Sequence, residues 1–393
     1  MGAIRCFFLI LLSGGLLSCV STPSSNQEFF AQLPQAKTLN LREGFLWFFA
    51  TESDCQQFSD FIDQSVQKLK PAVSQAYLME ERIQILNRYF FEELGFAFDR
   101  QDPLGKNPDN VHLVRVIERR KGFCLSLSLL YLVVGLELQL PLYGVKAPNH
   151  FFLRCEENTE GFINIEPTNS GLPLPNSHYV EKLKIDSKSL MQEYYLRNLT
   201  RKEVFAEYLS NYLVLWPPPE GISVLELYQY AVECSPQSPE IHLNYANTLY
   251  EHNRLKEALS LYDRAVELNA SNPEVFSQRA VVYGKLGEFP QALKDFEVAL
   301  TLEPNYFPAL WNRALAFHKN QNFDFAEQDY LSVLKQNSKY AGAHHNLAVL
   351  YSETNDWEQA RKHGEEAVYL EPANIKYQET LKKIVHFQRQ TFK

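Results

Sequence analysis

A 34-residue period governs the C-terminal half of this 393-residue chain. Alanine recurs at that spacing in two series, at Ala246, Ala280, Ala314 and Ala348, and at Ala258, Ala292, Ala326 and Ala360. Two further series share the period: Ala265, Ala299, Val333 and Ala367, and the aromatic residues Tyr262, Phe296 and Tyr330. Small side chains let two helices approach closely, and aromatic ones fill the space between units. The period therefore predicts stacked pairs of antiparallel helices.

This pattern resembles the tetratricopeptide repeat (TPR), whose unit is a helix–turn–helix of 34 residues. The resemblance covers about 224–374, with full units expected at 239–272, 273–306, 307–340 and 341–374 and a half-unit before them. A polar helix at Ile375–Gln390 has the character of the cap that such arrays need. Gly364 stands where the other units have an aromatic residue, so we expect a looser last interface.

The resemblance implies a concave groove lined by the first helix of each unit. The groove would expose Asn247, Tyr250, Trp311, His318 and His345, together with Val281, Leu315 and Val349. In one interpretation an extended peptide or a protein partner binds there. In the other, these side chains pack against the N-terminal domain, and both interpretations stay open.

Composition limits the possible classes of protein. Hydrophobic residues make up 45% and charged residues 22%, as in globular domains, and the length favours two domains, which we place at 41–215 and 216–393. The formal net charge of −9, without a block of like charges, argues against a nucleic-acid partner. Six cysteines with no C-x-x-C pair give no disulfide scaffold, and we assign no metal and no cofactor. The oligomeric state stays open.

The N-terminus has the features of an export signal. The apolar run Cys6–Leu12 is shorter than the roughly 20 residues that span a bilayer, so residues 1–18 are predicted to be a signal peptide. The sequence Leu16-Leu17-Ser18-Cys19 resembles the lipobox of bacterial lipoproteins, which implies cleavage before Cys19 and lipidation of that residue. Residues 19–40 would then tether the protein to the membrane of the cell envelope, facing the periplasm (on the outer membrane of a diderm cell).

Residues 41–215 show no repeat and mix two kinds of pattern. Helical periods predict helices at Phe58–Leu78 and Ile83–Leu94, the second ended by Gly95. The apolar run Leu129–Leu138 has no polar face, which indicates a helix buried on all sides and entered at Gly122. Short strands are expected at Leu142–Lys146, His150–Cys155 and Phe162–Glu166.

Cys124 falls in the first turn of that buried helix. The unpaired N–H groups and the helix dipole favour an anion there, and the thiolate is the nucleophilic form of cysteine. If the loop between the last two strands is a hairpin centred near Asn158, His150 lies opposite about residue 167 and within one residue of facing Glu166. A thiol, an imidazole and a carboxylate in this arrangement correspond to the nucleophile, base and orienting acid of covalent catalysis.

Three sequence blocks resemble the transglutaminase-like superfamily, in its SirB-type branch: GFCLSLSLLYL at 122–132, PNHFF at 148–152 and INIEPTNSG at 163–171. The block LNRYFFEELGF at 86–96 and the lead-in VIERRKG at 116–122 extend the resemblance. It implies a papain-like α+β core with Cys124 as nucleophile, His150 as general base and Glu166 as orienting acid. The superfamily usually has Asp at the last of these positions.

The expected architecture is an α+β papain/transglutaminase-like N-terminal domain followed by an all-α TPR solenoid. The resemblance implies cysteine-dependent acyl transfer or amide hydrolysis on a peptide or protein, with the repeats binding a partner. The alternative is a catalytically inactive transglutaminase-like/TPR scaffold that organises envelope partners. The substrate and the direction of the reaction stay open.

Overall fold

The computed structural model of the protein describes residues 29–30, 39–49, 51–102, 105–157, 161–218 and 221–391. The predicted signal peptide, Cys19 and nearly all of the predicted tether lie outside these residues. The chain divides into two units, Met1–Tyr245 and Ala246–Lys393, with the division inside helix α12 (Pro239–Glu251). Among the described residues, no helix has both the length and the apolar character needed to cross a membrane.

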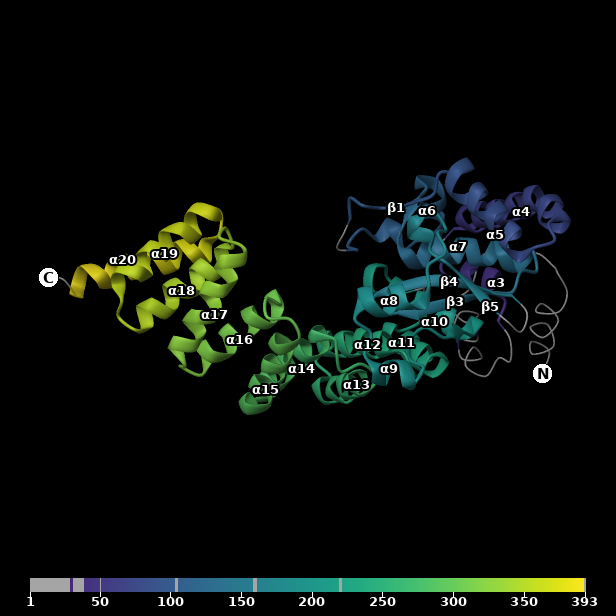
Figure 1. The fold of residues 1–393 in the computed structure, drawn as a ribbon. Helices are drawn as coiled ribbons and strands as arrows, with labels where there is room; N and C mark the ends of the chain where they lie inside the picture. The colour runs from purple at the N-terminus through teal and green to yellow at the C-terminus, as the bar shows by residue number, and fades with distance from the viewer. Residues whose placement is uncertain are drawn as a thin grey trace. The chain divides into compact units, whose positions relative to one another are not determined.

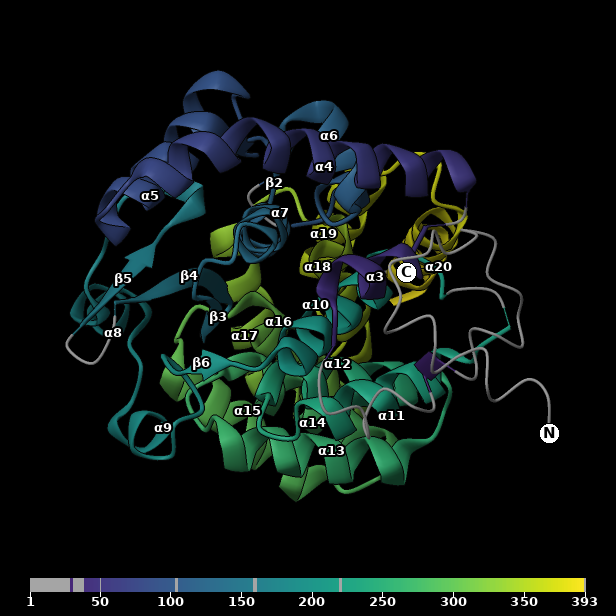
Figure 2. The same cartoon turned by 90° about the vertical axis from the view of Figure 1, so that its right-hand side faces the viewer.

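The N-terminal unit contains a four-stranded antiparallel sheet in the order β5-β4-β3-β6 (Figure 1; all four strands are labelled in Figure 2). Its strands are β3 (Leu142–Ala147), β4 (His150–Glu157), β5 (Gly161–Ile165) and β6 (Asn198–Leu199). A short parallel pair, β1 (Ala97–Phe98) and β2 (Lys121–Gly122), lies apart from it.

The other elements of this unit are helical. They are α3 (Leu41–Leu46), α4 (Glu52–Gln75), α5 (Met79–Asn87), α6 (Leu113–Arg119), α7 (Cys124–Glu137), α8 (Asn176–Leu183), α9 (Ser187–Met191), α10 (Arg201–Leu215) and α11 (Val224–Cys234). A π-helical stretch η2 (Arg88–Glu93) and two 3-10 turns, η3 (Pro108–Asn110) and η5 (Pro167–Asn169), complete the fold.

Helix α7 is the centre of the N-terminal unit. Every residue from Leu125 to Gly135 is buried, and the helix contacts strands β3 and β4 as well as helices α4 and α6 (Figure 2). An apolar helix is stable in water only when every side of it is covered. The prediction of a helix buried all round, with Cys124 in its first turn, is confirmed, and the helix begins at Cys124 itself.

The helices before α7 differ from prediction at their ends. Helix α4 begins at Glu52, six residues earlier than expected, because the Thr51 hydroxyl accepts a hydrogen bond from the Asp54 N–H (3.0 Å) and caps the helix. The next predicted helix is helical from Met79 onward, but its second half is the π-helical η2. Gly95, with φ +70°, ends it as expected.

The two compact units divide at 245/246, later in the chain than the predicted domain boundary at 215/216. Ile222, Leu227 and Ala231, in and just before α11, belong to the same buried cluster as α7. The Tyr228 hydroxyl also donates to the Ser210 carbonyl of α10 (3.4 Å). Helix α11 therefore packs with the N-terminal unit, although its sequence already follows the repeat pattern.

The C-terminal unit is entirely helical within its described residues. After α12 it contains α13 (Leu255–Leu268), α14 (Pro273–Leu286), α15 (Phe289–Leu302), α16 (Phe307–Lys319), α17 (Phe323–Gln336), α18 (Ala341–Glu353), α19 (Trp357–Leu370) and α20 (Ile375–Thr391). Consecutive helices pack in pairs, α14 with α15, α16 with α17 and α18 with α19. The alanines and aromatic residues that define the period are all at most 1% exposed, so the predicted helix pairs are confirmed.

Two features of this unit differ from the sequence analysis or were absent from it. Gly364 does not loosen the last interface, because Leu381 of α20 approaches so closely that a Cβ at Gly364 would lie 3.1 Å from it.

A buried ion pair also recurs with the period: Arg279 binds Asp295 and Arg313 binds Asp329, each through two hydrogen bonds of 2.7 and 2.8 Å.

Candidate functional site

The turn before α7 fixes the position of Cys124. A Cβ at Gly122 would lie 2.6 Å from Ser126 Oγ, so only glycine allows this approach. Ser126 Oγ accepts a hydrogen bond from the Phe123 N–H (3.0 Å) and donates one to the carbonyl of Asn110 (2.6 Å). The first residue of α7 is therefore held by a buried network, and its side chain remains partly exposed.

A tight hairpin places His150 at the start of strand β4. Ala147 pairs with His150, so Pro148 and Asn149 alone form the turn. Asn149 has φ +52°, a left-handed conformation that asparagine tolerates better than most residues. The side chain of His150 packs on the same face of β4 as Phe152, since their rings lie 6.2 Å apart.

The register of β4 and β5 differs by one residue from the prediction. Leu153 pairs with Ile165, and continuing that register places residue 168, not 167, opposite His150. Because side chains alternate between faces, this puts Glu166 on the same face as His150, as a diagonal neighbour. Diagonal neighbours lie about 7–8 Å apart, a distance that favours the longer glutamate side chain over aspartate.

The structure brings the three predicted site residues together. Glu166 Oε2 lies 2.7 Å from His150 Nε2, and the side chain of Cys124 lies close enough to the same imidazole to raise its pKa. Because Nε2 is engaged by the carboxylate, Nδ1 is the nitrogen available to the sulfur. The side chain of Glu166 is 5% exposed and that of His150 is 20% exposed, so the pair is shielded and Cys124 is its accessible end.

Charge governs the protonation of this pair. Burial lowers the pKa of His150, but hydrogen bonds and charge interactions with Cys124 and Glu166 outweigh burial and raise the pKa to about 10. Burial raises the pKa of Glu166, but hydrogen bonds from His150 and Thr168 outweigh it, so the pKa lies below its usual value. The arrangement therefore favours an imidazolium next to a carboxylate at neutral pH.

The loop that follows Glu166 is clamped to two helices. The Asn87 side-chain N–H donates to the Gly171 carbonyl (3.1 Å), and the Tyr131 hydroxyl of α7 donates to Asn87 Oδ1 (3.0 Å). The Glu166 N–H bonds the Leu172 carbonyl (3.2 Å) and closes the loop. This role of Asn87 was not predicted from the sequence, although the block LNRYFFEELGF contains the residue.

The five predicted groove residues have different surroundings in the repeats. Asn247 accepts a hydrogen bond from the Tyr262 hydroxyl (2.6 Å), and the Lys285 ammonium lies 4.0 Å from the Tyr250 ring centre. Trp311 packs against Tyr330 and Tyr340.

The two histidines of the set differ in exposure. His318 lies 3.2 Å from Glu353 and 3.3 Å from the Tyr330 hydroxyl. The prediction is wrong for His345, which is 4% exposed because Tyr377 of α20 stacks on it at 4.6 Å. The apolar positions Val281, Leu315 and Val349 remain partly exposed at the 34-residue spacing.

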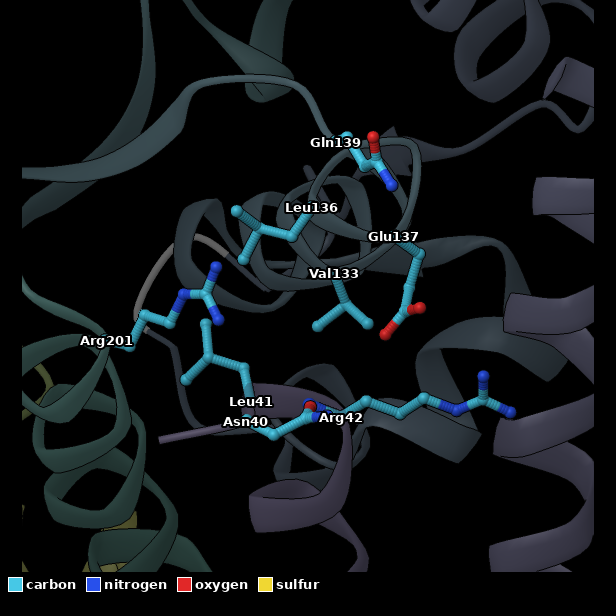
Figure 3. Close-up of a pocket in the computed structure, with 8 residues that line it drawn as sticks. All are labelled: Asn40, Leu41, Arg42, Val133, Leu136, Glu137, Gln139 and Arg201. Carbon is cyan, nitrogen blue, oxygen red and sulfur yellow. The ribbon is translucent and has the colours of Figure 1, made fainter. Parts of the chain in front are cut away.

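A separate cavity of about 200 Å³ lies at the other end of α7 (Figure 3). Leu41, Val133 and Leu136 line it, together with polar residues that include Arg201 and Glu137. None of the three site residues contributes to this cavity. Within the described parts of the chain, no three histidine, cysteine or acidic side chains are grouped to hold a metal ion.

Comparison with known families agrees with this architecture. A family model described as the transglutaminase-like superfamily matches residues 56–210. Models of the tetratricopeptide repeat match 227–260, 246–287, 278–341 and 341–370. The chain carries a transglutaminase-like domain followed by TPR repeats. The predicted arrangement is confirmed.

Individual relatives match between a fifth and a third of this chain. A "UPF0162 protein" of Xylella fastidiosa (strain 9a5c) is 29% identical over 131 residues, which are 33% of this chain and 46% of that protein. F-box only protein 21 of Mus musculus is 36% identical over 84 residues, 21% of this chain and 13% of that protein. The chain thus spans about half the length, or less, of these relatives.

Solved structures of TPR proteins align with part of this chain. The crystal structure of YrrB, described as a TPR protein with an unusual peptide-binding site, covers 52% of this chain and 97% of its own. Its sequence identity is 20% and its TM-score is 0.40. At this TM-score we base no conclusion on the likeness.

The clamp on the acid loop can be tested with a matched pair of glycine substitutions. Gly171 has φ +76° and a Cβ there would lie 2.2 Å from Asn87 Oδ1, whereas no atom lies within 4 Å of a Cβ at Gly161. Gly171→Ala should therefore lower the unfolding free energy by more than about 1 kcal/mol, measured by urea denaturation. Gly161→Ala should leave it nearly unchanged, and equal effects of the two substitutions would reject the clamp.

Proposed function

We propose that the transglutaminase-like domain is a cysteine-dependent acyl-transfer enzyme that acts on amide groups of peptides or proteins. The proposal rests on one observation above all: the His150 imidazole contacts both the Cys124 thiol and the Glu166 carboxylate. A nucleophile, a base and an orienting acid in hydrogen-bond sequence are the signature of covalent catalysis. The superfamily match to residues 56–210 supports the same class of chemistry.

The geometry supports the following course of reaction. In the resting site His150 already carries the proton that the Cys124 thiol has lost, and the Cys124 thiolate attacks the amide carbonyl carbon to form a tetrahedral intermediate. The imidazolium then gives its proton to the departing amine, which leaves a thioester on Cys124. A second amine or water attacks the thioester, loses its proton to His150 and releases the sulfur. Glu166 keeps the imidazole oriented and stabilises its charged form throughout.

The position of Cys124 supports its role as the attacking atom. It is the first residue of α7, where the backbone N–H groups of the first turn have no partner within the helix. These groups favour the thiolate, and they could also receive the oxygen of the tetrahedral intermediate. We assign the nucleophile to Cys124, because Cys55, Cys155 and Cys234 are buried among the described cysteines.

Alkylation with iodoacetamide tests the activated thiol. A free thiol with a pKa of about 8.5 is only about 0.3% ionised at about pH 6, so an unactivated Cys124 reacts slowly there. We expect Cys124 in the folded chain to react at least about tenfold faster than in the urea-unfolded chain, measured by mass spectrometry of its peptide.

Two substitutions serve as controls for that experiment. Cys124→Ser removes the labelled peptide, and His150→Gln keeps a polar side chain but removes the cation, so its rate should fall to that of the unfolded chain. Equal rates for the folded and unfolded wild-type chain would contradict the enzyme and would favour a binding module. An acyl adduct on Cys124 after exposure to a cell-envelope extract would identify the substrate.

We further propose that the TPR repeats bind an extended peptide segment of the substrate or of a partner protein. Two of the predicted groove residues have polar partners within the repeats, Asn247 with the Tyr262 hydroxyl and His318 with Tyr330 and Glu353. The partly exposed apolar side chains Val281, Leu315 and Val349 recur every 34 residues along the first helices. This spacing favours a peptide with several apolar contacts over one recognised by charge alone.

Leucine substitutions on the two helices of one repeat test this binding surface. Leu315 of α16 is 38% exposed and Leu331 of α17 is 43% exposed, so glutamate is accommodated at either position. Peptides that bind the wild-type chain are first selected from a random peptide library. Leu315→Glu should reduce the capture of these peptides by at least about tenfold, equivalent to about 1.4 kcal/mol. Leu331→Glu should leave capture unchanged, and the reverse pattern would move the surface to the second helices.

We also propose that residues 1–19 export the protein and anchor it in the cell envelope through a lipid on Cys19. The support is the sequence around Leu16–Cys19. An N-terminal peptide that begins at Cys19 and carries a diacylglyceryl group in mass spectrometry would bear this out, and an unmodified Cys19 would reject it.

A further inference from the structure

The Glu166 carboxylate is surrounded by hydrogen-bond donors beyond His150. Oε1 accepts from the Thr168 N–H (3.2 Å) and from the Thr168 hydroxyl (2.5 Å). Oε2 accepts from the Tyr179 hydroxyl (3.2 Å) as well as from His150 (2.7 Å). A carboxylate has about four acceptor positions, so all of them are used.

This surplus of donors matters because the carboxylate is buried. A buried carboxylate that lacks partners takes up a proton instead of keeping its charge. A protonated Glu166 would not stabilise the imidazolium of His150. The site needs a negative charge on Glu166 next to His150 Nε2. The hydrogen bonds from Thr168 and Tyr179 stabilise that charge.

Tyr179 is placed to hold both members of the pair. Its ring stacks on Phe152 at 4.0 Å with an interplanar angle of 2°, and it lies 5.9 Å from the His150 ring. Burial and then the charge of Glu166 raise the pKa of Tyr179, so its hydroxyl remains a donor. The Tyr179 ring therefore packs beside the His150 imidazole, and the Tyr179 hydroxyl binds the Glu166 carboxylate.

The helix that carries Tyr179 is itself tied to the sheet. Helix α8 begins at Asn176, whose side-chain oxygen accepts hydrogen bonds from Arg154 of β4 (2.8 Å) and Asn164 of β5 (3.0 Å). Val145, Ala147 and Phe152 of the sheet form one buried cluster with Tyr179. The strand that carries His150 therefore also positions the tyrosine.

We propose that Thr168 and Tyr179 are positioning residues of the Cys124–His150–Glu166 site, which hold Glu166 ionised and directed at His150. This inference rests on the proposed function, because it assigns the two residues a role in activating the thiol. If they serve only packing and the turn after β5, removing their hydroxyl groups leaves the chemistry of Cys124 unchanged.

The pH profile of Cys124 alkylation in the full chain tests this role. Thr168→Val and Tyr179→Phe each remove one hydroxyl and keep the shape of the side chain. With fewer donors, Glu166 supports the imidazolium less well, so His150 loses its proton at a lower pH and the pKa of His150 falls below its raised value of about 10. We expect the alkaline-side inflection of the alkylation rate, where His150 loses its proton, to move down by about one pH unit in each variant. Thermal unfolding of the same samples confirms that they are folded.

Two matched variants complete the experiment. Thr168→Ser keeps the hydroxyl and should restore the wild-type profile. Tyr262→Phe removes a hydroxyl that bonds Asn247 in the repeats and should not move the inflection. If the wild-type chain reacts as an ordinary free thiol, the proposed function fails and this inference fails with it. If the wild-type thiol is activated but the profiles of Thr168→Val and Tyr179→Phe coincide with it, only the positioning role is wrong.

Discussion

The apolar character of helix α7 is the constraint on which the N-terminal unit depends. Because residues 125–135 have no polar face, the sheet, α4 and α6 must cover the helix from several directions. That enclosure leaves the first residue, Cys124, as the point where the helix becomes accessible. Burial of the helix thus serves stability and also places a thiol at a fixed position among backbone N–H groups that have no helical partner.

The charged part of the site depends on a second constraint, the alternation of side chains along β4. His150 and Phe152 share the face that α8 covers, whereas Phe151 and Leu153 belong to the buried cluster that contains α7. His150 is the first residue of β4, so its imidazole lies at the end of the sheet. The sheet therefore does not separate the imidazole from the Cys124 thiol, although α7 packs on the opposite face. Glu166 reaches the same point from one residue beyond β5, and its loop is held there by Asn87 and Tyr131.

Features with a strong local signal could be predicted from the sequence, whereas contacts between distant segments could not. Every alanine that the 34-residue period identified is buried, and the unbroken apolar run identified α7. The predicted hairpin register was wrong by one residue, because the polar loop 156–161 gives no signal for its centre. A shift of one residue in the register moves Glu166 to the other face of the sheet. Tyr179 and Asn87 bond Glu166 or its loop from other helices, so no spacing rule could find them. His345 was misplaced because α20 covers it.

The protonation state of His150 tests the central claim most directly. Nitrogen-15 NMR of the full chain, with the His150 signals assigned by their loss in His150→Gln, can follow both ring nitrogens through a pH titration. The account predicts an imidazolium, protonated on both nitrogens, that persists through neutral pH and titrates toward about 10. A neutral ring at pH 7 that titrates near the ordinary value of about 6.5 would contradict it.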